Sequence, residues 1–228
     1  MADKGFTHLH LHTQYSLLDG AIALGKLFGR CRELGMDSVA ITDHGNLFGA
    51  VDFYTRAQAS QIKPILGIEA YIAPHSRFDK AGGGGVKEHA YHLILLAENR
   101  TGYRNLMKLS SIGFTEGFYY RPRIDKQVLA EFSEGIICTT ACVAGEVPAA
   151  LVRGDEAAAR QAVESYLKIF GEDRFFIEVQ HHEKPEGDDL PDVRRPLIDL
   201  AAKMGVGLIV TNDVHFLNAD DYEAHNAL

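Results

Sequence analysis

Short apolar runs alternate along the chain with longer stretches in which apolar residues recur every three or four positions. The short runs have the length and β-branched content of strands, and the longer stretches have the period of amphipathic helices. The predicted strands are Thr7–His12, Ser38–Thr42, Pro64–Ile72, Tyr91–Ala97, Gly135–Thr139, Phe175–Gln180 and Gly207–Thr211. This alternation predicts parallel βα units that close, or nearly close, into a barrel.

Helical periodicity is clearest at four places. Two predicted helices carry apolar faces made of Leu24, Leu27, Phe28, Cys31 and Leu34, and of Val193, Leu197, Leu200, Ala201 and Met204. A third spans Asp155–Phe170 behind an acidic first turn, and Asn218 is expected to cap a helix near the C-terminus. The glycine-rich stretch Ser76–Lys87 and the aromatic stretch Phe118–Pro122 are predicted to be connections. No interdomain linker interrupts the pattern, so residues 1–228 are expected to form a single domain.

Composition narrows the class of protein. The chain has 228 residues, which fits one α/β barrel of about 250 residues. No apolar run is long enough for a membrane span and the N-terminus lacks a signal pattern, so we expect a cytoplasmic location and no membrane partner. Three cysteines without Cys-x-x-Cys spacing argue against a disulfide framework. A net charge of −8 would repel nucleic acid unless bound cations reverse the field locally.

The first predicted strand carries three histidines. His8, His10 and His12 alternate with leucines, which places the imidazoles on one face of the strand. Three imidazoles are a costly way to fill a barrel interior without a metal ion. We predict that His10 and His12 are metal ligands and that His8, deeper in the strand, has a structural or supporting role.

Further polar residues stand at or near the ends of the other predicted strands. Each alone is more often structural. Buried cysteines usually pack as small apolar groups, and a lone histidine is usually a structural residue. An Asp in a turn, as at Asp19, often only forms that turn. Together they are too many for coincidence: Asp43, His44, Glu69, His92, Cys142, Glu178, His181, His182, Asp213 and His215. The mixture of imidazole, carboxylate and thiol suits zinc, manganese or iron, and the number of groups suffices for about two or three ions.

These residues resemble the motif set of the polymerase and histidinol phosphatase (PHP) superfamily. The resemblance is closest to the PHP domains that begin bacterial DNA polymerase III α subunits, through the segments Tyr15–Gly20, Asn46–Ala50, Ile62–Gly67, Thr101–Leu106 and Arg123–Asp125. It implies a distorted seven-stranded (β/α)7 TIM-like barrel with two to three divalent transition metals. The ligands it implies are His10, His12, Asp19, His44, Glu69, His92, Cys142, Asp213 and His215. Stand-alone phosphatases of the superfamily often have a histidine, at slightly different spacing, where this chain has Asp19.

A cationic metal centre in an acidic chain favours phosphate chemistry, and hydrolysis of a phosphate ester is the natural reaction. Asp43 or His182 is expected to assist proton transfer, and Arg121 or Arg123 to hold a nucleic-acid backbone. For both pairs, a solvated surface role is an equally good interpretation.

Three functions remain open at this stage. The resemblance implies a metal-dependent 3′–5′ exonuclease that proofreads DNA, whose partners would be the DNA 3′ end, the remaining polymerase domains and replisome subunits. The alternatives are a small-molecule phosphatase or pyrophosphatase, and a catalytically silent structural module of the polymerase. No residues for nucleotide polymerisation are found in the chain, so none is expected from it.

Overall fold

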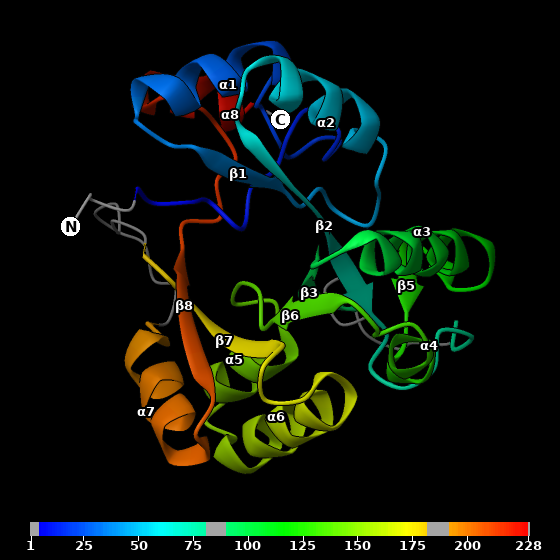
Figure 1. Cartoon of the computed structure of the whole chain (residues 1–228). Coiled ribbons are helices and arrows are strands. Elements are labelled where there is room, and N and C mark those ends of the chain that lie inside the picture. Colours follow the sequence, from blue (N-terminus) through cyan, green and yellow to red (C-terminus); the bar gives the residue numbers. More distant parts are fainter. Residues whose placement is uncertain (1–4, 81–89, 182–191, 228) are drawn as a thin grey trace.

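The computed structural model describes residues 5–80, 90–181 and 192–227 (Figure 1). Its strands are β1 (Ser38–Ile41), β2 (Lys63–Ile72), β3 (Tyr91–Ala97), β4 (Phe118–Tyr119), β5 (Arg121–Ile124), β6 (Ile136–Thr139), β7 (Phe175–Gln180) and β8 (Gly207–Thr211). Its helices are α1 (Leu24–Glu33), α2 (Ala50–Ala59), α3 (Arg100–Thr115), α4 (Lys126–Glu131), α5 (Glu146–Val152), α6 (Glu156–Phe170), α7 (Arg194–Met204) and α8 (Tyr222–His225). Figure 1 shows these helices on the outside of a curled sheet. None of the described helices is long and apolar enough to cross a bilayer.

The strands form a mixed sheet in the order β4-β5-β2-β3-β6-β7-β8, with β1 also paired to β2. The prediction of parallel strands throughout is wrong at β3, which runs antiparallel to both β2 and β6. Alternation of apolar residues is the same in either strand direction, so it could not reveal this reversal. Because β3 is reversed, His92 near its start lies beside Tyr71 near the end of β2.

The first predicted strand does not form. Thr7–His12 makes only isolated bridges, and Leu11 is paired with Val214. Its main chain nevertheless joins the two sides of the ring. The N–H of Thr42, the residue after β1, donates to Leu11 O (2.9 Å), and the N–H of His12 donates to the carbonyl of Val214, beyond β8 (2.8 Å). An irregular segment therefore closes the barrel where a regular strand was expected.

The predicted connection Phe118–Pro122 is wrong, because it forms β4 and the first half of β5, an antiparallel pair. The predicted helices are confirmed as α1, α6 and α7, and the last one as a short turn, Ala219–Asp221, followed by α8 with a capping box at Asn218. Leu34 is the exception on the first apolar face, since it lies just past α1 and is half exposed. Residues 81–87 of the predicted glycine-rich loop lie outside the described residues.

Alternation along the strands sorts their side chains between two faces. The outward residues of β2, β3, β6 and β7 pack with α3–α7 in the largest core cluster. A second cluster, which includes Leu11 and Ile22, joins β1 to α1 and α2. The inward residues Ala40, Ile94 and Leu96 form a small apolar layer inside the ring. Glu69, Tyr71, His92 and Glu178 alternate with outward core residues of their strands, so they belong to the inner face as well.

Candidate metal centre

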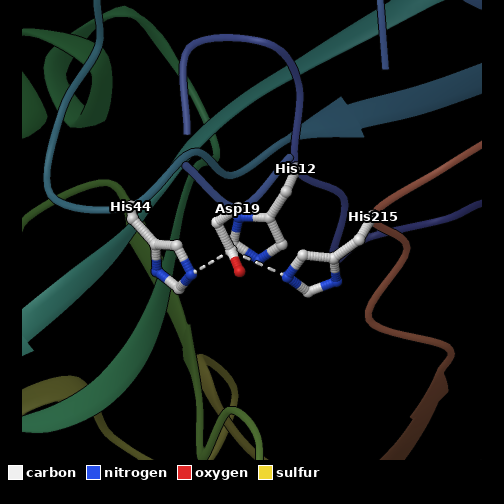
Figure 2. Close-up of side chains that lie close together, drawn as sticks. All are labelled: His12, Asp19, His44 and His215. Carbon is white, nitrogen blue, oxygen red and sulfur yellow. Dashed lines mark hydrogen bonds and ion pairs between the residues drawn. The ribbon is translucent and has the colours of Figure 1, made fainter. Parts of the chain in front are cut away.

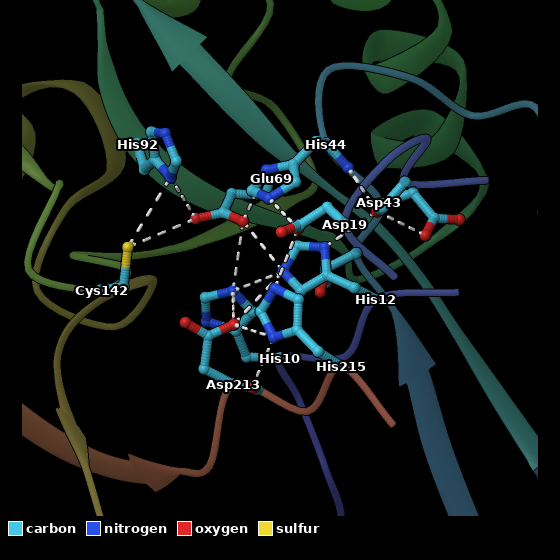
Figure 3. Close-up of polar contacts among 12 residues, drawn as sticks. His10, His12, Asp19, Asp43, His44, Glu69, His92, Cys142, Asp213 and His215 are labelled. Carbon is cyan, nitrogen blue, oxygen red and sulfur yellow. Dashed lines mark hydrogen bonds and ion pairs between the residues drawn. The ribbon is translucent and has the colours of Figure 1, made fainter. Parts of the chain in front are cut away.

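Side-chain atoms of four residues meet at the centre of the inner face (Figure 3). His10 Nε2 lies 3.1 Å from His12 Nε2, 3.3 Å from Glu69 Oε2 and 3.0 Å from Asp213 Oδ1. His12 Nε2 lies 3.0 Å from Glu69 Oε2 and 3.3 Å from Asp213 Oδ1. Atoms that share one tetrahedral ion at about 2.0–2.1 Å are separated by about 3.3 Å. His10, His12 and Glu69 therefore have the mutual spacing of ligands around one small cation, and Asp213 Oδ1 lies similarly close to both imidazoles.

Hydrogen bonding does not explain this convergence. Glu69 Oε2, Asp213 Oδ1 and His44 Nδ1 are buried and have no hydrogen-bond partner among the described residues, although imidazole nitrogens or carboxylate oxygens lie close to each. Buried polar atoms without partners are rare because each one loses its bonds to water. The donor set therefore fits metal ions better than it fits an internal hydrogen-bond network.

The second oxygen of Glu69 faces another candidate set. Glu69 Oε1 lies 2.8 Å from His92 Nδ1, and Cys142 Sγ lies 3.8 Å from Glu69 Oε1 and 3.7 Å from His92 Nδ1. A sulfur and a nitrogen or oxygen on one tetrahedral zinc are about 3.5 Å apart. One carboxylate thus reaches two ligand sets, as in a multinuclear centre.

The third set gathers around Asp19, in the loop after the first segment. Figure 2 shows His44 and His215 pointing at Asp19 from opposite sides, with His12 between them. Asp19 Oδ2 lies 2.8 Å from His44 Nε2 and 3.0 Å from His215 Nε2, and both rings stack on His12. Together the three sets bring all nine predicted ligands into one cluster, and their role as ligands remains a prediction.

The electrostatics of the cluster attract positive charge. Burial disfavours the charged form of His10, yet the charges of Asp213, Glu178 and Glu69 raise its pKa well above the usual value. Burial also opposes ionisation of Glu69, but the surrounding histidines lower its pKa well below the ordinary range. Burial, with the charges of Glu69 and Asp213, raises the pKa of the Cys142 thiol. A bound cation would favour the thiolate over the thiol at this position.

Supporting side chains hold the histidines in place, and the sequence analysis did not assign them. Glu178 Oε1 lies 2.8 Å from His10 Nδ1, which directs His10 Nε2 toward the centre. Thr139 and Thr211 both donate their hydroxyls to Glu178. Glu178 was visible in the sequence as a carboxylate inside an apolar strand, but its partners come from other strands. Carboxylates behind histidine ligands are common in metal sites because they fix the ring orientation.

Asp43 lies behind the first segment. Its carboxylate accepts hydrogen bonds from Thr13 N–H (2.7 Å) and from the hydroxyls of Thr13 and Ser16. Ser16 Oγ in turn lies 3.0 Å from His12 Nδ1. These contacts favour a positioning role for Asp43 over the predicted role in proton transfer. His182, the other predicted proton-transfer residue, lies outside the described residues.

The two predicted backbone-binding arginines differ sharply. Arg123 is 2% exposed, and its guanidinium donates to the carbonyls of Gly117, Arg77 and Asp79. The prediction that Arg123 holds nucleic acid conflicts with this burial, because a phosphate could not reach it without displacing those bonds. Arg121, two residues earlier on the same strand, is exposed. His8, predicted to be structural, is partly buried beside Phe6, and no described group bonds its Nδ1.

Within the described part of the chain, some residues of the cluster are open to solvent and others are not. The side chains of His10, His12 and Glu69 are 0–1% exposed, whereas those of His44, His215 and His92 are 17%, 19% and 21% exposed, and that of Asp19 is 39% exposed. A substrate can therefore approach the centre from the side of Asp19, His44 and His92.

Comparison with protein families adds a decisive observation. The PHP domain family matches residues 8–182, a range that holds seven of the nine clustered residues. The chain belongs to the PHP domain family.

Among solved structures, this PHP domain resembles a protein of Bifidobacterium adolescentis assigned to the metal-dependent phosphoesterases, with 14% identity, a TM-score of 0.57 and coverage of 94% and 89% of the two chains. It also resembles an amidohydrolase of Chromobacterium violaceum, with 12% identity, a TM-score of 0.55 and coverage of 97% and 96%. At these identities the likeness concerns the fold, which confirms the predicted distorted TIM-like architecture.

Among curated proteins, the PHP domain is 46% identical to the DNA polymerase III subunit alpha of Treponema pallidum and 45% identical to that of Thermus aquaticus. The matches cover 100% and 98% of this chain but only 19% and 18% of those relatives. The chain thus spans about a fifth of the length of the curated relatives it matches.

Proposed function

We propose that this PHP domain is a metal-dependent phosphoesterase that acts as a 3′–5′ exonuclease on DNA, in the cytoplasm and beside the other domains of a replicative polymerase. The convergence of His10, His12, Glu69 and Asp213 carries the proposal, since the buried oxygens Glu69 Oε2 and Asp213 Oδ1 lack hydrogen bonds. The likeness to polymerase subunits favours DNA over a small phosphate ester, which is the alternative substrate class.

In this proposal two or three zinc, manganese or iron ions supply the positive charge that polarises a phosphate ester and activates water. The chain's own residues have distinct tasks. Glu178 fixes His10, and Ser16 fixes His12, so that both rings present Nε2 to the centre. Asp43 anchors the first segment through Thr13 and Ser16. Arg121, exposed on β5, is available to bind substrate phosphates.

The substitution Asp213→Asn tests the proposal. Asp213 has a positive φ of 51°, which asparagine adopts more readily than alanine, so this change removes the charge with little strain. We expect the variant to fold, to lose at least one metal ion on elemental analysis, and to cleave end-labelled DNA more slowly by several decades. Asp173→Asn, an exposed position after α6, is the matched control.

Three outcomes count against the exonuclease. Parental cleavage rates in Asp213→Asn would eliminate the site. Hydrolysis of p-nitrophenyl phosphate without any cleavage of DNA would move the function to the small-molecule alternative. A metal-loaded parent that hydrolyses neither substrate would favour a structural module of the polymerase.

A further inference from the structure

Tyr71 lies on the wall of the centre, two residues beyond Glu69 on the same inner face of β2. It is 6% exposed, and its ring lies between two clustered histidines. The ring stacks on His44 at 5.8 Å between centroids and meets the edge of His92 at 5.2 Å. Both histidines belong to the open side of the cluster, so Tyr71 borders the route by which substrate enters.

The hydroxyl of Tyr71 has no assigned task within the protein. Among the described residues, no group forms a hydrogen bond with it, and it does not belong to the fully buried polar atoms although most of the side chain is buried. The hydroxyl is therefore available to donate a hydrogen bond to a ligand beside His44 and His92.

Arg121 supplies a positive charge at the same place. Its guanidinium carbon lies 5.6 Å from the centroid of the Tyr71 ring. Within the described part of the chain, no carboxylate forms an ion pair with Arg121, whereas Arg77 is paired with both Glu116 and Asp125. Arg121 therefore keeps its charge available at the open side.

Close packing holds these groups to the wall. Gly45 has a φ of +65°, and a Cβ there would lie 2.7 Å from Pro122 Cγ and 3.0 Å from the Tyr71 ring. The loop that carries His44 thus rests directly on Tyr71 and on the residue after Arg121. The Tyr71 ring and the main chain of β5 beside it are thus held against the cluster.

We propose that the Tyr71 hydroxyl and the Arg121 guanidinium form a phosphate clamp, in which both donate hydrogen bonds to non-bridging oxygens of a phosphate group held at the centre. The proposal rests on the proposed phosphoesterase function, because that function makes a phosphate the ligand. A phenol and a guanidinium that lie beside each other favour an anion with several acceptor oxygens, and hydrogen bonds from a guanidinium to phosphate are charge-assisted. A free phosphate ion and the phosphate of a DNA 3′ end share this chemistry.

Binding of inorganic phosphate to the manganese-loaded chain, measured by calorimetry, tests the clamp without relying on turnover. Tyr71→Phe removes only the hydroxyl and keeps the ring between the two histidines. Arg121→Gln removes the charge, and Arg100→Gln is its matched control, because Arg100 is exposed and begins α3 beyond the far end of β3. Manganese content is measured in every variant.

We expect the dissociation constant for phosphate to rise about fivefold in Tyr71→Phe and about tenfold or more in Arg121→Gln, with Arg100→Gln within about twofold of the parent. If Tyr71→Phe loses manganese, Arg121→Gln alone decides. Parental affinity in both clamp variants, or no phosphate binding by the parent, overturns the clamp. A parent that binds phosphate through these residues but hydrolyses no ester refutes the phosphoesterase and leaves the clamp in place. Cleavage of end-labelled DNA by each variant then shows whether the same contacts serve a DNA end.

Discussion

Replacing Glu178 with glutamine perturbs the centre without removing any of the nine clustered residues. Glu178 is 1% exposed and faces four groups: the hydroxyl of Thr139, the hydroxyl of Thr211 at 2.6 Å, His10 Nδ1 at 2.8 Å and the Gln180 amide at 3.3 Å. The carboxylate can accept a hydrogen bond from each of them. A glutamine of the same shape must turn its NH2 group toward at least one donor, and if that donor is His10 Nδ1, the ring is free to rotate.

The structure sets the size of the effect. A buried hydrogen bond to a charged group contributes about 1.5–3 kcal/mol. Loss of a residue that supports a ligand typically lowers metal affinity by about 10- to 100-fold, which corresponds to about 1.4–2.8 kcal/mol. The two figures agree, so we expect Glu178→Gln to bind manganese about 10- to 100-fold more weakly. Since no ligand is removed, hydrolysis should recover largely at high manganese concentration, unlike that of Asp213→Asn.

Calorimetric titration of metal-free protein with manganese measures this affinity, and cleavage of end-labelled DNA across a manganese series measures the recovery. Glu172→Gln, at an exposed position before β7, is the control for loss of one negative charge. Manganese affinity in Glu178→Gln equal to that of the control would refute the reasoning that Glu178 positions His10.

Three further predictions concern stability. Removing metal with a chelator should lower the melting temperature in a calorimetric scan, because ions bound only by the folded state stabilise it; an unchanged value contradicts this. Gly45→Ala should lower the free energy of unfolding by about 2 kcal/mol in urea, through its positive φ and its contacts with Pro122 and Tyr71. Gly154→Ala, with φ +74° and open space around it, isolates the φ cost, and equal losses in the two variants would argue against the contacts. Burial opposes ionisation of Asp125, but hydrogen bonds from Arg77 and Val128 lower its pKa, so the stability it adds is present at neutral pH and is lost as pH falls through that lowered pKa. Asp125→Asn should therefore flatten the acid limb of the stability curve measured by thermal denaturation, and an unaltered limb would contradict this.

The period of apolar residues predicted most of the strands well, because it depends only on which side chains the core accepts. Tyr91–Ala97 and Phe175–Gln180 coincide with β3 and β7. The same pattern failed for Thr7–His12, whose main chain bonds to neighbours at irregular positions. The direction of β3 could not be predicted either, because a reversed strand keeps the same alternation of apolar and polar residues.

The candidate site was predictable to the extent that its residues carry their own signal. His10 and His12 stand out by spacing, and Glu69 stands out as a carboxylate in an apolar run. The supporting contact between Glu178 and His10 could not be inferred, because it depends on the register of strands far apart in the sequence. The burial of Arg123 could not be inferred for a similar reason: the carbonyls of Gly117 and Asp79 that bind its guanidinium are brought to it only by the fold.

The irregular closure of the barrel bears on the order of folding. Leu11 meets Val214, and the cluster unites His10 and His12 with Asp213 and His215, so residues from nearly opposite ends of the sequence must come together before the centre exists. Contacts between residues so far apart in the sequence form late. The chain must first lose the entropy of closing the intervening loop, and only then do the contacts compensate for that loss. An ion that bridges both ends then acts as a non-covalent cross-link, comparable to a disulfide that closes a very long loop. Without it, the seam between Leu11 and Val214 should be among the first parts of the barrel to open, and its main-chain amides among the first in the ring to exchange with solvent.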